Sequence, residues 1–267
     1  MTPADIFSDV IRSIARYDAG FPARVRGAAD DDIRRHEALS GAPAPEIYRA
    51  FLAAMGHDPG GLTPLAASTR LPDVLASLAR RRPSPGYCLI AVQDNHPHLD
   101  VYLDVQAPEL TPGAGPPVVR FEAGANIAAP DRASAPSAPA PDEEPVQIYP
   151  AYPSLPDMIV STAFARFRVA TLPHRAYLVP SGPTWPEERR LERPAILAAL
   201  AARQSFTRLL HTSLQTACYD KPTAAMQVYS PHDLSFSIEL AATTRKALEG
   251  AIETLQEPLS LVEERVS

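Results

Sequence analysis

The stretch DNHPHLD, residues 94–100, carries the side chains that come nearest to a metal site. His96, His98 and Asp100 are residue types that bind zinc and related divalent ions, and a His-x-His spacing on a strand places two imidazoles on one face. Pro97 between the two histidines favours a loop instead, and no further His or Cys cluster nearby completes a ligand set. We therefore interpret the stretch as a hairpin loop and predict neither a metal nor a cofactor.

The chain has two cysteines, Cys88 and Cys218, which are too few for a disulfide framework and lack metal-binding spacing. Cys88 lies within the apolar run YCLIAV, where burial would raise the thiol pKa and make it a poor nucleophile. Cys218 has no histidine close in the sequence, and we predict a packing role for both. The chain also lacks a G-x-S-x-G turn and a phosphate-binding loop. We predict a protein that is not an enzyme; the alternative is a hydrolase that uses Cys218 or the 96–98 loop.

Carboxylates and a tyrosine recur around the predicted strand LDVYLDV, residues 99–105. Alternation of apolar and polar residues is typical of a half-buried strand, with the polar residues on the exposed face. A solvated strand face is the simpler interpretation. The alternative is a binding face on which carboxylates steer a basic partner and the tyrosine supplies contact area, with the acidic stretch 142–145 as a possible addition. The residues predicted to bind the partner are Asp94, Asp100, Tyr102, Asp104 and Glu122.

The composition of the chain disfavours nucleic-acid-binding, secreted and membrane-spanning proteins. The 267 residues carry a formal net charge of −6, which disfavours binding to nucleic acid and suits a basic partner, although many proteins carry such a charge for solubility alone. The N-terminus has an acid at Asp5 and no basic segment before an apolar core, so it does not resemble a secretion signal. No apolar run has the roughly 20 residues that a membrane-spanning helix needs. We therefore expect a cytoplasmic protein.

Periodicity in the first part of the chain predicts helices followed by strands. Apolar residues at helical spacing indicate four helices before residue 83, and a change of period indicates three strands after it. A segment at about 123–148, dense in Pro, Ala and Ser, reads as a mobile insertion. The helix SLPDMIVSTAFARF follows, with Ser154 and Asp157 spaced as a capping box. We assign these elements to a first domain, residues 1–168.

Residues 169–267 are predicted to form a second, smaller α+β domain. The expected order is the strand RAYLVP, a long helical region from Trp185 to Leu214 that restarts at Pro194, a hairpin formed by AAMQVYS and LSFSIEL, and a closing helix that stops at Pro258. The fold class predicted for the whole chain is α+β.

The segment IRRHEALSGAPAPEIYRAFLAAMG resembles the opening of the SUKH superfamily, in which a helix ends near an acidic residue, a Gly- and Pro-containing break follows, and an aromatic-bearing helix leads to a second Gly. The residues that carry this resemblance are Ile33, Glu37, Gly41, Pro45, Tyr48, Phe51, Leu52 and Gly56. The later predicted elements follow the family's order as far as Phe167. The long Pro-rich insertion departs from the family pattern, and residues 169–267 have no counterpart in it.

The resemblance implies a SUKH-like antiparallel sheet with flanking helices, used as a protein-binding module without enzymatic activity. Bacterial members are typically immunity proteins that neutralise a toxin, often a nuclease, and fungal relatives regulate cell-wall synthesis. The expected partner is therefore a basic toxin domain. The alternative is a regulatory or structural adaptor without a toxin, in which residues 169–267 mediate oligomerisation or docking to a secretion system. The sequence leaves the oligomeric state open.

Overall fold

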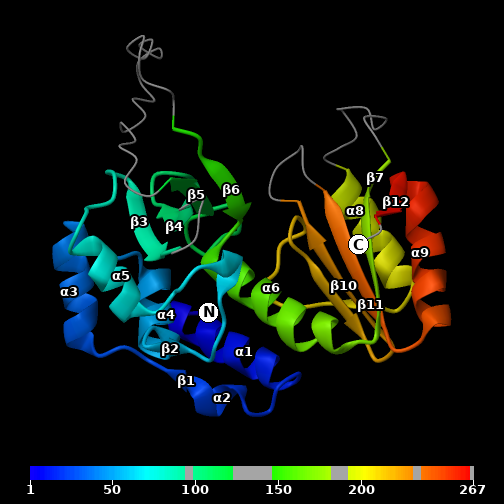
Figure 1. Cartoon of the computed structure of the whole chain (residues 1–267), viewed down its shortest axis with the longest axis horizontal. Helices are drawn as coiled ribbons and strands as arrows, with labels where there is room; N and C mark the ends of the chain where they lie inside the picture. Colours follow the sequence, from blue (N-terminus) through cyan, green and yellow to red (C-terminus); the bar gives the residue numbers. More distant parts are fainter. Residues whose placement is uncertain (94–98, 123–145, 182–191, 231–235, 265–267) are drawn as a thin grey trace, which may run out of the picture. The chain divides into compact units, whose positions relative to one another are not determined.

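The computed structural model describes residues 1–93, 99–122, 146–181, 192–230 and 236–264 (Figure 1). The chain forms two compact units, of which unit 1 comprises Met1–Asp9 and Gly20–Leu155, and unit 2 comprises Val10–Ala19 and Pro156–Ser267. Antiparallel sheets and packed helices in both units confirm the α+β class. The division differs from the predicted boundary after residue 168, because most of the helix that was assigned to the first domain belongs to unit 2.

Unit 1 combines short helices with a four-stranded antiparallel sheet of order β3-β4-β5-β6. Its elements are α1 (Pro3–Ala15, whose residues from Val10 onward count with unit 2), α2 (Phe21–Arg24), β1 (Val25–Arg26), α3 (Asp30–Ser40), α4 (Glu46–Met55), β2 (Asp58–Pro59), η1 (Pro64–Ala66), α5 (Leu71–Leu78), β3 (Tyr87–Ala91), β4 (Leu99–Asp104), β5 (Val118–Glu122) and β6 (Tyr149–Tyr152).

The turn from α3 to α4 forms as the glycine and proline pattern predicts. Gly41 has the left-handed backbone (φ 75°) that glycine adopts without steric cost, and its N–H donates to the Glu37 carbonyl. Pro45 precedes the first turn of α4. The Glu37 side chain holds the turn, since its Oε1 accepts hydrogen bonds from the Ala44 N–H at 3.0 Å and from Arg49 Nε at 2.8 Å. An acidic residue four positions before the glycine therefore ties the two helices together.

Strand β4 is buried on both faces. Its even-numbered residues Asp100 and Tyr102 lie in or beside the core that α5 forms with β3 and β5, and its odd-numbered residues Val101 and Leu103 are fully buried on the opposite face. The predicted half-buried strand is therefore wrong. Alternation reports the polarity of the side chains, but helices from elsewhere in the chain decide whether the polar face meets water.

Unit 2 is built on a six-stranded sheet of order β12-β7-β11-β10-β9-β8, in which every neighbouring pair is antiparallel. Its elements are α6 (Leu155–Phe167, of which Leu155 counts with unit 1), η2 (Val169–Thr171), β7 (His174–Pro180), α8 (Arg193–Arg203), β8 (Thr207–Arg208), β9 (Cys218–Lys221), β10 (Ala224–Tyr229), β11 (Ser237–Ala242), α9 (Arg245–Leu259) and β12 (Leu261–Glu264).

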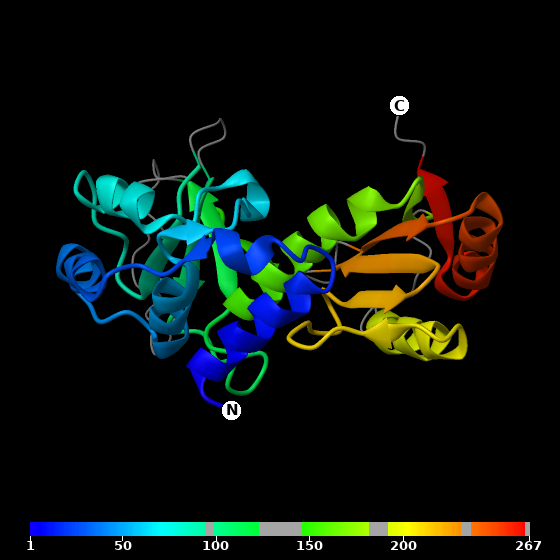
Figure 2. The same cartoon turned by 90° about the horizontal axis from the view of Figure 1, so that it is seen from below.

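Helices cover both faces of this sheet (Figure 2). On one face, α8 and α9 pack against large apolar residues of β10 and β11 such as Met226 and Ile238. On the other face, Phe164 of α6 packs against small residues, Cys218, Ala225 and Ala241. The small side chains let α6 approach the sheet closely, and this contact explains why α6 belongs to unit 2.

Several elements of unit 2 match their predictions. The hairpin of β10 and β11 is confirmed, and α9 begins where Thr244 accepts a hydrogen bond from the Ala247 N–H. Pro258, expected as the stop, lies in the last turn of α9. The helical region predicted to continue to Leu214 ends at Arg203, because the chain turns through Ser205 (φ 62°) and enters β8. Strands β9 and β12 were not predicted.

Candidate functional site

Asp100, predicted to lie on an exposed acidic face, is completely buried. Its carboxylate forms an ion pair with Arg81, which follows α5, and it also accepts a hydrogen bond from the Gln93 N–H at 3.1 Å. A buried carboxylate needs such partners, since an unpaired one would lose its hydration without compensation. We predicted that Asp100 lies on the surface and contacts a partner protein there. This prediction is wrong, because Asp100 is not exposed.

Tyr102, the second residue of that predicted face, is also buried. Its ring stacks on Phe121 with centroids 3.9 Å apart and an interplanar angle of 6°, and it meets the edge of Tyr87 at 6.4 Å. Burial and the neighbouring Asp100 carboxylate raise the pKa of its hydroxyl. Tyr102 therefore contributes to the core of unit 1 and offers no exposed contact area.

Of the remaining predicted residues, Asp104 is half-buried and Glu122 is exposed. The Asp104 Oδ1 atom accepts hydrogen bonds from the backbone N–H groups of Gln106 and Ala107, both at 3.1 Å. Asp104 therefore orders the chain that leaves β4. The other predicted residue, Asp94, lies outside the described residues, as do His96, His98 and the acidic stretch 142–145.

The segment 104–115, which we name the acidic–apolar loop, carries two exposed apolar residues that follow Asp104 and Glu109 in the sequence. Leu110 is 61% exposed and Val105 is 43% exposed. Hydrogen bonds hold the loop both internally and to the residue before β3. Glu109 Oε2 accepts a hydrogen bond from the Gly113 N–H at 2.8 Å, and the Val105 N–H donates to the Gly86 carbonyl at 2.9 Å. Sequence reasoning missed this loop, although a leucine beside a glutamate in a Pro- and Gly-rich stretch was a visible signal.

Gly115 fixes the end of the loop against α4. Its φ of 83° is left-handed, and a Cβ atom placed there would lie 2.4 Å from Ile47 Cγ2. We expect Gly115→Ala to lower the free energy of unfolding of unit 1 by about 2–3 kcal/mol, through the left-handed backbone and the steric overlap together.

Gly113→Ala is the matched control for this substitution. Gly113 has nearly the same backbone (φ 74°), but nothing lies within 4 Å of the position of its Cβ. Only the backbone strain of about 1 kcal/mol applies there. Urea unfolding measures both variants, and equal losses would show that Gly115 does not pack against α4 as described.

Both cysteines occupy the packing positions predicted for them. Burial raises the pKa of the Cys88 thiol to about 12 and also raises the pKa of the Cys218 thiol. Among the residues that the structure describes, no group of three or more His, Cys, Asp and Glu side chains is arranged to hold a metal ion. The described helices include none with the length and apolar character to cross a membrane.

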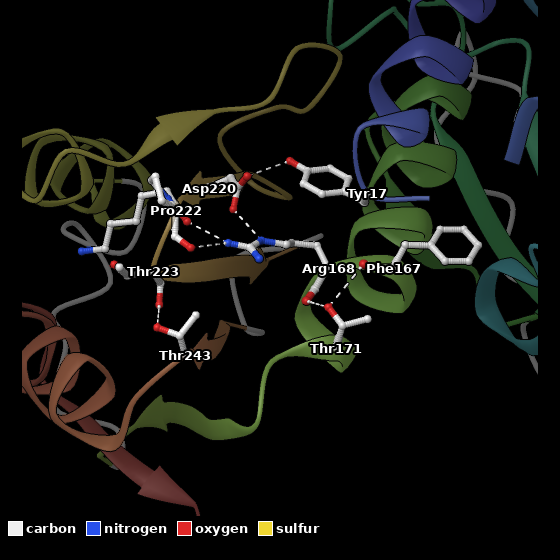
Figure 3. A network of polar contacts seen from close by, with 9 residues as sticks. Tyr17, Phe167, Arg168, Thr171, Asp220, Pro222, Thr223 and Thr243 are labelled. Atoms are coloured by element: carbon white, nitrogen blue, oxygen red, sulfur yellow. Dashed lines mark hydrogen bonds and ion pairs between the residues drawn. The ribbon is translucent and has the colours of Figure 1, made fainter. Parts of the chain in front are cut away.

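A polar network centred on Asp220 lies within unit 2 (Figure 3). Arg168 Nε donates to Asp220 Oδ1 at 2.8 Å, and Arg168 Nη2 donates to the carbonyls of Lys221 at 2.8 Å and Pro222 at 3.3 Å. The Tyr17 hydroxyl donates to Asp220 Oδ2 at 3.0 Å. These contacts attach the chain after α1 and the end of α6 to β9, so we assign the network a structural role.

Comparison with known proteins gives no relative from which a function could be transferred. No family model, no curated protein and no solved structure matches this chain. A proposal about function therefore depends on the acidic–apolar loop and the chemistry of its side chains.

Proposed function

We propose that the chain is a protein-binding module without enzymatic activity, and that it acts in the cytoplasm as an immunity protein that binds and neutralises a cognate toxin. The observation that carries this proposal is the acidic–apolar loop, where Leu110 is 61% exposed beside the carboxylate of Glu109. An exposed apolar side chain gains free energy when a partner covers it, and the two carboxylates of the loop, Asp104 and Glu109, would favour a basic partner.

Two further features support the immunity class. The turn from α3 to α4, with Gly41 in the left-handed conformation and Glu37 joined to Arg49, fits the SUKH resemblance, as does the antiparallel sheet that follows it in the chain. The net charge of −6 also suits a basic toxin domain, because opposite charges accelerate association.

Co-expression tests the proposal. The gene for a basic toxin domain beside the gene for this chain would be expressed alone and together with it. We expect co-expression to restore growth and the two proteins to purify as a complex. Failure of both would contradict the proposal, and a complex that gives no protection would favour the adaptor alternative.

We expect Leu110→Asp to weaken partner binding by at least tenfold, because it puts a charge into the apolar centre of the contact. Val262→Asp is the control, since Val262 is 44% exposed on β12 of unit 2, and it should leave the affinity within about twofold of wild type. Surface plasmon resonance with the immobilised partner measures both. Equal effects of the two substitutions on affinity would show that the loop is not part of the interface.

Glu109→Gln isolates the role of charge in the same loop. A glutamine oxygen can still accept the hydrogen bond from the Gly113 N–H, so the loop keeps its order while it loses one negative charge. We expect a reduced association rate with a weaker dependence on salt, and little change in the dissociation rate. An unchanged association rate at low salt would show that Glu109 does not steer the partner.

A further inference from the structure

The six-stranded sheet of unit 2 ends in two strands that run in opposite directions. Every neighbouring pair in it is antiparallel, so β12 at one edge runs opposite to β8 at the other. In the part of the chain that the structure describes, no further strand pairs with either edge. A second copy placed beside the first in the same orientation therefore brings its β8 antiparallel to β12.

The backbone groups that point outward from β8 belong to Arg208. The Leu209 N–H donates to the Cys218 carbonyl at 2.8 Å, so Leu209 bonds inward to β9. Successive residues of an antiparallel strand turn their backbone groups to opposite sides, and Arg208 therefore offers its N–H and C=O at the edge. Its side chain lies on the face that α8 and α9 cover, because Arg208 is directly opposite Tyr219, which belongs to that core.

On β12, the outward backbone groups belong to Leu261 and Glu263. The Ser181 N–H donates to the Ser260 carbonyl at 2.9 Å, and Pro180, which has no N–H, is opposite Leu261. The backbone groups of Leu261, and of Glu263 two positions later, therefore point away from β7. The Glu263 side chain shares a face with Leu261, which packs in the core under α8 and α9.

The two edges carry opposite charges. Residues 203–210 contain two arginines, Arg203 and Arg208, and no acid, whereas residues 257–267 contain three glutamates and one arginine. Arg208 and Glu263 are exposed, and the described residues include no ion-pair partner for either. Pairing of two β8 edges or of two β12 edges about a twofold axis would bring like charges together. The charges therefore favour a head-to-tail contact between copies.

We propose that copies of this chain associate head to tail through unit 2, with β12 of one copy paired antiparallel to β8 of the next and Glu263 opposite Arg208. The outward backbone groups of these two residues then bond to each other, and their side chains form an ion pair on one face. The same register sets Leu209 opposite Val262, which is 44% exposed. Since the paired strands are short, the contact is small, and we expect a dissociation constant on the order of 0.1 mM.

Sedimentation equilibrium of the full chain at low salt tests this association. The average mass of the wild-type protein should rise with protein concentration up to about 0.5 mM, and added salt should reverse the rise. Arg208→Glu and Glu263→Arg should each weaken self-association at least tenfold, because like charges then meet at the contact. An equal mixture of the two variants should associate, because the unchanged Glu263 of the first meets the unchanged Arg208 of the second.

Lys246→Glu is the matched control, because it changes the net charge as Arg208→Glu does, at an exposed position of α9. It should leave the association within about twofold of wild type. Wild-type protein that stays monomeric up to the highest concentration would overturn the proposal, as would an Arg208→Glu variant that associates as well as Lys246→Glu. A mixture of the two edge variants that associates no better than either variant alone would also overturn it.

Discussion

Arg81→Ala is expected to lower the free energy of unfolding of unit 1 by about 3 kcal/mol, because it removes the cationic partner of a fully buried carboxylate. Asp100 has 0% side-chain exposure in the intact protein, so its charge depends on partners that the fold provides, while Arg81 itself is 36% exposed. The cost comes mainly from the uncompensated charge and less from the attraction that is lost.

Arg82→Ala is the control for this prediction, since Arg82 is the next residue in the chain and is exposed. Its effect should stay within about 0.5 kcal/mol. The double variant Arg81→Met/Asp100→Leu should recover much of the stability, because it removes both charges together. Urea unfolding measures all three. A similar loss for Arg81→Ala and Arg82→Ala would contradict the buried pair.

Arg168→Ala is expected to destabilise unit 2 by about 2–3 kcal/mol. The guanidinium pairs with Asp220, and both side chains are largely shielded, at 17% and 19% exposure. It also donates to the carbonyls of Lys221 and Pro222, at the turn that follows β9 (Figure 3). One substitution therefore removes an ion pair and leaves backbone acceptors without their donor.

Two comparisons test the assignment of this loss to the network. Tyr17→Phe removes a single hydrogen bond to Asp220 and should cost about 1 kcal/mol. Lys246→Ala, at an exposed position of α9, should cost less than about 0.5 kcal/mol. Hydrogen exchange of β9 and β10 reports the stability of unit 2 locally. An Arg168→Ala variant as stable as Lys246→Ala would show that the network adds nothing.

Local signals in the sequence predicted α1, α3, α4 and α5 and the break between α3 and α4. The helical spacing of Ile6, Phe7, Val10 and Ile14 gives α1, and the glycine at 41 with the proline at 45 gives the break between α3 and α4. These features depend on a few neighbouring residues and on backbone conformations that glycine and proline favour. They could therefore be predicted without knowledge of tertiary contacts.

Long-range pairing is what the sequence pattern could not show. The sequence pattern predicts that Asp100 is a surface residue. Only the folded structure shows that it pairs with Arg81, which lies 19 positions earlier. Likewise, Asp157 fits a capping box in sequence, and nothing local in the sequence shows that its side chain also binds Ser213 and Thr216, more than 50 positions away. The same limit explains the domain boundary, because only the packed structure shows which sheet α6 covers.

The candidate binding surface is the loop that follows β4 and not the strand itself. The charge pattern of the sequence predicted the polar face of β4, but Asp100 and Tyr102 on that face lie in the core. Asp104 stays within the revised site as a residue that orders the loop, and Leu110 joins it because the fold leaves that side chain exposed. The Pro- and Gly-rich stretch around Leu110 indicated a loop in the sequence, but the exposure of that single leucine depends on the whole structure.

The most direct test of the proposed function is hydrogen exchange of the chain with and without its co-purified partner, which reports the segments that binding covers. We predict increased protection in the acidic–apolar loop, residues 104–115, and unchanged protection in β11 of unit 2. Protection confined to other segments, with the loop unaffected, would contradict the assignment of this loop as the partner-binding surface.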